Sequence, residues 1–387
     1  MTPVLAGVVQ RGDVAGLVAL TARGNETHLE IHGVQDLASP APMTRETIFR
    51  IASITKLITA VAAMTLVEEA RIRLDDSIES WLPELANRQV LRSLDRPVTD
   101  TVPASRPITL RDLMTSQMGF GAVMAMPNTY PIQTLIDRSG LAAGPVEPQL
   151  SHDDYMCRLG TLPWLHHPGE GWRYHHASDV LGILIARITG GSLADALRER
   201  IFDPLRMADT GFAVPASSLP RLATVYARDA AAKLQPFTDG RQGSLGAQPT
   251  FESGGGGLFS TADDLLAFGR MMLAKGYAPT GRILSRPGIT LMTTDQISQF
   301  AKAQSPFSPG FWEHQGWGFG LSVVTSRGSI SQTPGAYGWN GGYGTTLHID
   351  PSEDMISIFL MQRLMTAPDD SGLNEDFLTL AYQAIED

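Results

Sequence analysis

The chain has 387 residues, of which 43% are hydrophobic and 18% charged, a composition typical of folded globular proteins and unlike disordered or fibrous chains. Acidic residues outnumber basic ones by 40 to 30, giving a net charge of −10, which disfavours binding to nucleic acids and to anionic membrane surfaces. The one cysteine, Cys157, excludes an internal disulfide and any multi-cysteine metal site, and we expect it to be buried as a small apolar side chain.

The length of the chain predicts two packed regions, because one hydrophobic core usually stops growing at ~250–300 residues. Residues 1–13 lack a positively charged start followed by an apolar stretch, and no span of ~20 apolar residues occurs in the sequence. We therefore expect a cytoplasmic protein without a membrane partner.

The N-terminal part of the sequence predicts a β-hairpin followed by a long helix. Residues 14–22 and 28–34 are rich in β-forming residues and flank turn residues at 24–25. From Ser53 to about residue 70, apolar residues follow helical spacing, with Ser53 placed as the N-cap. We expect this helix to be mostly buried.

The middle of the chain predicts a mainly helical region. Residues 95–107 contain three prolines and show no periodicity, so we expect an extended surface segment there. Helical patterns follow, with Ser178 and Ser192 as N-caps. Their ranges are 108–115, 151–159, 178–189 and 192–202.

The C-terminal part predicts a helix and then a sheet. The glycines at 254–257 indicate a flexible approach to a helix over 261–274. The candidate strands beyond it are separated by turns too short for helical crossovers, so we expect an antiparallel meander covered by a final helix. The strands cover 318–325, 345–349 and 356–360, and the final helix covers 377–385.

This order of elements predicts an α/β (α+β) fold in which an antiparallel sheet is flanked by helices and carries an inserted, mainly helical domain. We place the sheet domain at residues 1–85 and 240–387, and the helical domain at 86–239. The sequence shows no repeat of ~20–50 residues, which excludes solenoids and propellers.

The one Ser-x-x-Lys sequence, Ser53-Ile54-Thr55-Lys56, stands at the start of the predicted long helix. Residues three positions apart lie on one helix face, ~5–6 Å apart at Cβ, so the lysine amine can reach the serine hydroxyl. A serine becomes a nucleophile when a neighbouring base removes its proton. Burial and the positive end of the helix dipole both disfavour the ammonium form of Lys56, which would make it such a base. Taken alone, the pair also fits a helix cap and a lysine that extends to solvent.

Two further segments carry groups that suit an activated serine. Tyr174 follows the turn at 168–171 and directly precedes a helix, where a phenol close to an ammonium group can relay a proton. The glycine-rich run at 338–344 lets the backbone approach a ligand closely, and an N–H there would complete an oxyanion hole. By themselves, these segments also fit a tyrosine that anchors a helix and a glycine-rich hairpin turn.

In this order and at these separations, the three segments resemble the serine β-lactamase and penicillin-binding protein superfamily, and most closely its esterase branch, the family VIII carboxylesterases. The resemblance extends over nearly the whole chain and includes residues 49–56, 108–115 and 254–261. It implies a β-lactamase-like fold and a serine hydrolase that forms an acyl-enzyme with a small-molecule ester and needs no metal or other cofactor.

The resemblance also implies a role for each matching residue. Ser53 is the nucleophile, and Lys56 and Tyr174 share the general-base and general-acid work. The oxyanion donors are the backbone N–H groups of Ser53 and Gly342. The other positions expected to line the substrate are Gly341, Trp339, Asn340 and His176.

Two positions depart from the β-lactamase and peptidase pattern. His176 stands where Tyr-x-Asn motifs have their asparagine, so the amide that grips an acylamino side chain is missing. Trp339 stands where Lys-Thr-Gly or His-Thr-Gly motifs have their cation, so the group that binds a substrate carboxylate is missing. Both departures favour an uncharged substrate, and we expect a carboxylesterase acting on short-chain acyl esters.

Other functions stay open at the level of sequence. An acyltransferase, a D-amino-acid amidase or a β-lactamase-like hydrolase would use the same acyl-enzyme, with the loops at 116–130 and 236–253 selecting the acceptor. A non-catalytic ligand sensor would keep the fold and lose turnover. The chain has no Gly-x-Ser-x-Gly, which excludes an α/β-hydrolase. The histidine pairs at 166–167 and 175–176 lack the spacing of a zinc site.

Overall fold

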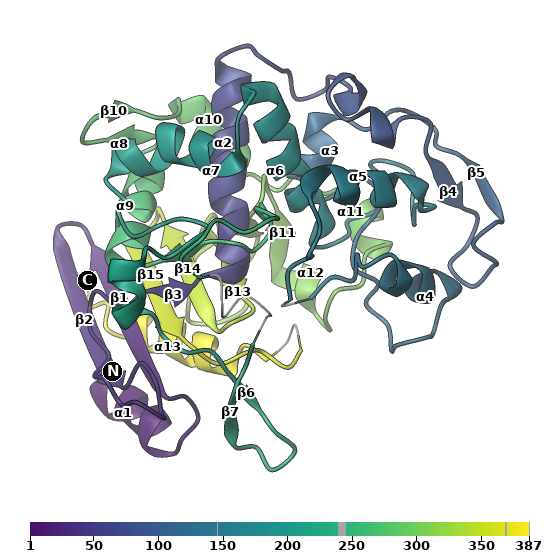
Figure 1. Cartoon of the computed structure of the whole chain (residues 1–387). Helices are drawn as coiled ribbons and strands as arrows, with labels where there is room; N and C mark the ends of the chain where they lie inside the picture. Colours follow the sequence, from purple (N-terminus) through teal and green to yellow (C-terminus); the bar gives the residue numbers. More distant parts are fainter. Residues whose placement is uncertain (145, 239–244, 368–369, 387) are drawn as a thin grey trace.

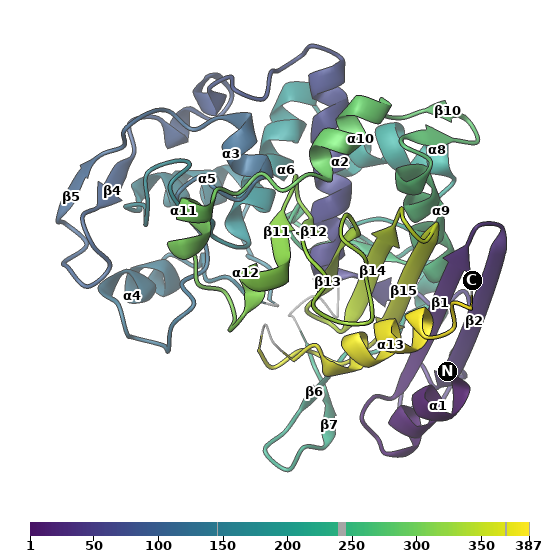
Figure 2. The ribbon, with the colours of Figure 1, turned by 180° about the vertical axis from the view of Figure 1, so that it is seen from behind.

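A seven-stranded antiparallel sheet forms the centre of the fold, with helices on both faces and a mainly helical region beside it (Figure 1, Figure 2). The computed structural model describes residues 1–144, 146–238, 245–367 and 370–386. Across the sheet the strands follow the order β11-β12-β13-β14-β15-β1-β2. They cover Gln315–Trp317 (β11), Ser322–Val324 (β12), Tyr337–Gly341 (β13), Thr345–Asp350 (β14), Met355–Met361 (β15), Gly16–Arg23 (β1) and Glu26–Gly33 (β2).

The structure also contains α-helices and short paired strands outside this sheet. The helices are α1 (Thr2–Gln10), α2 (Thr55–Glu68), α3 (Leu110–Met114), α4 (Pro131–Arg138), α5 (His152–Thr161), α6 (His176–Thr189), α7 (Leu193–Leu197), α8 (Asp203–Leu205), α9 (Ala262–Leu273), α10 (Arg286–Met292), α11 (Gln299–Ala303), α12 (Phe311–His314) and α13 (Gly372–Tyr382). The short strands pair as β3 (Phe49–Arg50) with β8 (Phe259–Ser260), β4 (Gln89–Leu91) with β5 (Thr101–Pro103), β6 (Tyr226–Arg228) with β7 (Leu234–Pro236), and β9 (Tyr277–Ala278) with β10 (Gly281–Arg282).

Both faces of the sheet centre are buried, and strand β1 shows why. Successive side chains of a strand point to opposite faces. Leu17 and Ala19 pack in one apolar cluster with residues of α1 and α13, whereas Val18 and Leu20 pack in the main core with residues of α2 and α9. Each fully buried leucine of this kind contributes roughly 1.5–3 kcal/mol to folding. The sheet therefore gives the rest of the molecule a rigid support.

The predicted hairpin and the predicted meander are both confirmed. β1 pairs with β2, and β12 to β15 are antiparallel neighbours in chain order. The hairpin also joins the meander, because β1 pairs with β15, so the two ends of the chain build one sheet. The predicted fold class, an antiparallel sheet flanked by helices, is therefore confirmed.

Several element boundaries in this half of the chain differ from the prediction. The strand predicted over 318–325 is limited to β12, because Gly318 donates its N–H to the Leu321 carbonyl and Gly320 has a φ of 74°, so the chain turns there. α1 and β13 were not predicted as regular elements. The final helix α13 begins at Gly372, earlier than predicted.

The helical patterns predicted in the middle of the chain correspond to α3, α5, α6 and α7. Ser192 caps α7, as predicted, because its side chain accepts a hydrogen bond from the Asp195 N–H. Ser178 is not an N-cap: α6 begins two residues earlier, and His175 takes the N-cap position with a φ of 87°. The segment 95–107, predicted to be extended, contains the short strand β5.

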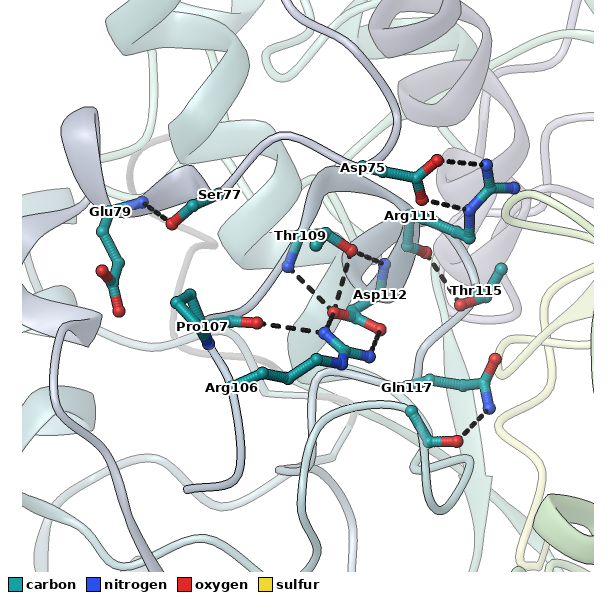
Figure 3. A network of polar contacts seen from close by, with 11 residues as sticks. Asp75, Ser77, Glu79, Arg106, Pro107, Thr109, Arg111, Asp112, Thr115 and Gln117 are labelled. Carbon is teal, nitrogen blue, oxygen red and sulfur yellow. Dashed lines mark hydrogen bonds and ion pairs between the residues drawn. The ribbon is translucent and has the colours of Figure 1, made fainter. Parts of the chain in front are cut away.

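A polar network around Asp112 fixes the start of α3 (Figure 3). The Asp112 carboxylate accepts hydrogen bonds of 2.6 and 2.8 Å from the Arg106 guanidinium and closes the capping box of the helix. Directly after α3, the Gln117 side chain donates to the Gly169 carbonyl at 3.1 Å. Because Gly169 belongs to the turn that precedes Tyr174, this network connects α3 to the loop that carries the tyrosine.

Cys157 is exposed, which corrects the expectation of a buried side chain: it lies on the outer face of α5, whose buried residues are Tyr155, Met156 and Leu159. The predicted domain boundary between residues 239 and 240 lies outside the described residues.

Among the described helices, none is long and apolar enough by itself to cross a membrane. The helix α6 and the segment Leu193–Leu205, bent by 82°, would meet the length and hydropathy criteria together.

Candidate active site

Ser53 lies in a short 3-10 turn, Ala52–Ile54, directly before α2. This placement corrects the prediction that Ser53 caps the helix: Ile54 occupies the N-cap position, and no side chain caps the backbone there. The preceding residue, Ala52, has a φ of 44°, a strained conformation for a residue with a side chain. The turn leaves the Ser53 hydroxyl free to meet Lys56, whose Nζ lies 3.1 Å from Ser53 Oγ.

Lys56 is buried, with 1% of its surface exposed. Its side-chain amine donates to Ser53 Oγ and to the Gly255 carbonyl, the second at 2.5 Å. It also stands 4.5 Å above the centre of the Tyr174 ring, a cation–π arrangement. These contacts fix the amine directly behind the serine hydroxyl.

The loop that carries Gly255 is held by Asp179, a fully buried carboxylate of α6. Asp179 Oδ1 accepts hydrogen bonds from Ser253 Oγ at 2.6 Å and from the Gly255 N–H at 2.9 Å, and His175 Nε2 lies 3.4 Å from Oδ2. Burial alone would raise the pKa of Asp179, but the hydrogen bonds and the charge of these neighbours outweigh it and hold the pKa at about 2. Asp179 is therefore ionised beside the lysine.

The glycines at 254–257 were predicted to give flexibility, and the structure corrects this reading. A Cβ at Gly254 would stand 2.5 Å from the Ser178 carbonyl oxygen. The glycine is needed because the loop packs directly on the backbone of α6. This close approach places the Gly255 carbonyl within reach of Lys56.

Tyr174 and Trp339 meet across the site. The Trp339 indole N–H donates to the Tyr174 hydroxyl at 2.6 Å, and their rings lie 5.7 Å apart. Trp339 also packs edge-on against Trp317 at 4.8 Å, and Tyr174 lies 5.2 Å from Phe307. The tyrosine hydroxyl is thus oriented by the tryptophan, and Lys56 faces the ring of Tyr174.

The end of β13 approaches the serine turn very closely. A Cβ at Gly341 would lie 2.4 Å from the Ile51 carbonyl oxygen, and Thr345 Oγ1 already donates to that oxygen at 3.0 Å. Glycine is therefore required at 341. A Cβ added to the next residue, Gly342, would meet no atom of the described residues within 4 Å. Within the described part of the chain, the N–H groups of Ser53 and Gly342 make no hydrogen bond, so both are available to an oxyanion.

Two other predicted site residues lie at the edges of the arrangement. His176 is buried, and its Nε2 lies 2.7 Å from the Leu141 carbonyl, so one side of its ring is occupied. Burial, together with the neighbouring His175, lowers the pKa of His176 to about 4, so the ring is neutral near pH 7. Asn340 is half-buried, and its Oδ1 accepts hydrogen bonds from Thr346 and His348.

Ser53, Tyr174 and Trp339 line one cavity of about 830 Å³. The cavity also receives Asn340, Gly342 and His176, so the structure brings these predicted site residues together. Gly341 is not among the described residues that line the cavity, because it packs against the Ile51 carbonyl. In the part of the chain that the structure describes, no group of three or more His, Cys, Asp or Glu side chains is placed as metal ligands would be.

Sequence reasoning missed Asp179, Ser253 and Gly255. The signal for Asp179 was an acidic residue on the most apolar part of a helix, where every following residue up to Ala186 is buried. A charge in such a place needs partners. The signal for Gly255 was the glycine run itself, which was interpreted as a flexible segment.

A serine whose hydroxyl meets a buried lysine amine, close to a tyrosine and an open backbone N–H, is an arrangement that suits a serine hydrolase. The chain belongs to the Beta-lactamase family, whose profile matches residues 3–378. It is a β-lactamase-fold protein of the serine hydrolase and acyltransferase group.

Three similar proteins illustrate this membership. The chain is 37% identical over 362 residues to Protein Rv1367c of Mycobacterium tuberculosis, covering 92% of this chain and 87% of the relative. It is 29% identical to Esterase EstB of Burkholderia gladioli, covering 87% and 83%. The solved structure of EstCE1, described as a hydrolase with promiscuous acyltransferase activity, superposes with a TM-score of 0.80 at 24% identity, covering 98% and 97%.

Proposed function

We propose that the protein is a serine carboxylesterase that hydrolyses short-chain acyl esters through an acyl-enzyme on Ser53. The observation that carries the proposal is the 3.1 Å contact between Ser53 Oγ, which lines the cavity, and the amine of the buried Lys56. The relationship to Esterase EstB supports the choice of ester as the substrate. The preference for short acyl chains follows from the resemblance of the sequence motifs to those of the family VIII carboxylesterases.

In the proposed mechanism, neutral Lys56 takes the proton of the Ser53 hydroxyl as Oγ attacks the ester carbonyl. The developing oxyanion is stabilised by the N–H groups of Ser53 and Gly342. Tyr174 passes a proton to the leaving alcohol, and the C–O bond breaks to give the acyl-enzyme. Water then attacks the acyl-enzyme with the same groups in reversed roles, which releases the acid and restores Ser53.

The charges around the cavity favour an uncharged substrate. Among the described lining residues there is no lysine or arginine, whereas Asp137, Glu147 and Glu375 contribute carboxyl groups. An anionic substrate would find no opposite charge there and would be repelled by these carboxylates. This supports a neutral ester over a carboxylate-bearing β-lactam or peptide.

Acyl transfer is the second candidate, favoured by the size of the cavity. About 830 Å³ is far more than a short acyl chain fills, and the aromatic side chains of Phe307, Phe311 and Trp339 line part of it. Such a wall binds organic molecules. An alcohol held there would compete with water for the acyl-enzyme.

One assay tests both candidates. We expect hydrolysis of p-nitrophenyl acetate and butyrate, with little turnover of long-chain esters, and a serine-directed phosphonate probe should label Ser53. Added methanol should divert a fraction of the acyl groups to the methyl ester if transfer competes with hydrolysis. Labelling of Ser53 without steady-state turnover would instead indicate a ligand sensor. The absence of both labelling and turnover would overturn the proposal.

A further inference from the structure

The cavity that Ser53 lines is also lined by neutral amides. Asn340 and Gln332 reach it from the sheet side, and Asn374 reaches it from α13. Figure 2 shows α13 lying beside β13, β14 and β15. None of these amides takes part in the proposed acyl-enzyme chemistry, so their presence in the same cavity as Ser53 needs another explanation.

Asn374 is the most unusual of them. Only 1% of its surface is exposed, yet neither its Oδ1 nor its Nδ2 has a hydrogen-bond partner in the described chain. Leaving a buried amide unpaired costs folding free energy, and buried polar groups in native proteins are nearly always paired. A side chain retained at such a cost at a cavity wall is expected to gain its partner from a ligand.

The orientation of Asn340 is fixed by a second set of contacts. Its Oδ1 accepts from Thr346 Oγ1 at 3.0 Å and from His348 Nε2 at 3.1 Å. Burial lowers the pKa of His348 to about 4, so the ring is neutral and has one N–H. Gln332 Nε2 lies 2.7 Å from His348 Nδ1 and donates to it, which places the ring proton on Nε2. The Asn340 Nδ2 group, which makes no hydrogen bond in the described chain, is left as a donor.

We propose that Asn340 and Asn374 form a subsite for a neutral amide-like group on the ester substrate, a carbonyl that accepts from their Nδ2 groups beside an N–H that donates to Asn374 Oδ1. Two neutral amides match such a group in both directions. A carboxylate would lack the N–H and would also meet the negative charge of Glu375, which follows Asn374 in α13 and lines the same cavity. The inference rests on the proposed esterase function and names its substrate class.

The test compares esters that differ only at the remote group. On the acyl side, p-nitrophenyl adipamate carries a terminal carboxamide, its isopropyl isostere is apolar, and p-nitrophenyl hydrogen adipate is anionic. On the alcohol side, the acetates of the matching hydroxy amide, hydroxy alkane and hydroxy acid form the second set. The measured quantity is the ratio of kcat/KM for the amide to kcat/KM for its apolar isostere, with the anionic ester expected to be the poorest of each set.

In the Asn374→Leu and Asn340→Leu variants we expect this ratio to fall roughly 5- to 50-fold, because the amide ester loses one or two neutral hydrogen bonds. The set of esters in which the ratio falls assigns the subsite to the acyl group or to the leaving alcohol. We also expect the Tm of Asn374→Leu to be equal to or higher than that of the unaltered protein, because an unpaired buried amide is removed. A side chain with only a structural role would give a lower Tm.

The matched control is Asn25→Leu, the same change in the exposed turn between β1 and β2, and it should leave the ratio unchanged. An unchanged ratio in both Asn374→Leu and Asn340→Leu, in protein that still hydrolyses the apolar esters, would overturn the subsite and leave the esterase proposal standing. If Asn374→Leu does not fold, its amide is structural, and the ratio in Asn340→Leu decides. Loss of all ester hydrolysis in the unaltered protein would instead refute the proposed function.

Discussion

At the scale of single residues, Lys56 is the group around which the site is arranged. Its amine meets a hydroxyl, a carbonyl and the face of a tyrosine ring, and among the described residues it forms no ion pair with a carboxylate. The buried Asp179 carboxylate accepts from the Gly255 N–H, while the Gly255 carbonyl accepts from Lys56, so Gly255 connects the two side chains. Lys56 is therefore held in place by groups from three separate parts of the chain.

The first prediction concerns Ser53 and Lys56 together. Ser53→Ala and Lys56→Ala should each lower kcat by ~10²–10⁴-fold or more, because nucleophile and base act as a unit. The double variant should then be no worse than the poorer single variant. Steady-state kinetics with p-nitrophenyl butyrate measure this, and circular dichroism checks that the fold is intact. A Lys56→Ala protein that keeps half its kcat would contradict the role proposed for the lysine.

The second prediction concerns Asp179 as a positioning residue. Asp179→Asn keeps an oxygen to accept from Ser253 and Gly255 but removes the negative charge near Lys56. The charge-assisted hydrogen bonds that hold the Gly255 loop against Lys56 become neutral ones, so kcat for p-nitrophenyl butyrate should fall roughly 5-fold or more while KM changes little. Asp195→Asn, at the exposed start of α7, is the control and should leave kcat unchanged. An unchanged kcat in Asp179→Asn, in protein that is still folded, would contradict the positioning role of Asp179.

At the scale of elements, α9 packs against the sheet and begins with a buried carboxyl group. Thr261 caps the helix by accepting from the Asp264 N–H. Asp264 Oδ2 in turn accepts from the Asp209 N–H at 2.9 Å and from Thr210 Oγ1 at 2.7 Å. Burial raises the pKa of Asp264 to about 6 despite these hydrogen bonds. The start of the helix is therefore a place where stability depends on pH.

The third prediction follows from this raised pKa. Folded Asp264 holds its proton up to pH about 6, whereas the unfolded chain releases it near 3.8. The folded state thus binds more protons between these values, and this group's contribution to stability falls as the pH rises through that window. Asp264→Asn removes the effect, so its stability relative to the unaltered protein should improve by roughly 1–3 kcal/mol between pH ~4.5 and ~7.5.

Urea unfolding at the two pH values measures this difference. Asp376→Asn is the control, because it makes the same change at an exposed position of another helix, α13. We expect its stability difference from the unaltered protein to be the same at both pH values. A difference for Asp264→Asn that is also independent of pH would show that the carboxyl group does not titrate in this range.

At the scale of the whole molecule, the site is assembled from parts far apart in the chain. Ser53 comes from the 3-10 turn before α2, Lys56 from the first turn of α2, Tyr174 from the helical region, Gly255 from the loop before β8, and Trp339 from β13. The sheet holds the first and last of these together, because Thr345 and Gly341 close on the Ile51 carbonyl. The shape and charge of the cavity therefore depend on the whole fold.

The fourth prediction concerns this cavity and β-lactams. Ser53 should open a reactive cephalosporin slowly, since acylation needs only the nucleophile, its base and the oxyanion donors. Without a cation at position 339 or an asparagine at 176, nitrocefin loses contacts worth about 2–4.5 kcal/mol in sum, or roughly 30- to 2000-fold in kcat/KM. Its kcat/KM should therefore be below that for p-nitrophenyl butyrate on the same preparation. An equal or higher value for nitrocefin would return the chain to the β-lactamases.

The sequence by itself determined the order of elements, the fold class and the pairing of Ser53 with Lys56. These properties depend on local spacing: alternation predicts strands, helical periodicity predicts helices, and two residues three positions apart meet on one turn. The departures from the β-lactamase motifs at Trp339 and His176 were also visible in the sequence. They led to the expectation of an uncharged substrate.

The tertiary structure alone decided which distant groups meet. The Trp339 bond to the Tyr174 hydroxyl joins residues 165 positions apart, and the Lys56 bond to Gly255 joins residues 199 positions apart. No local pattern encodes such contacts, because they arise when separate elements pack on one another. The same reason explains the errors over Ser53 as a helix cap, over the Gly254 run as a flexible segment and over the burial of Cys157: each depends on what the neighbouring element supplies.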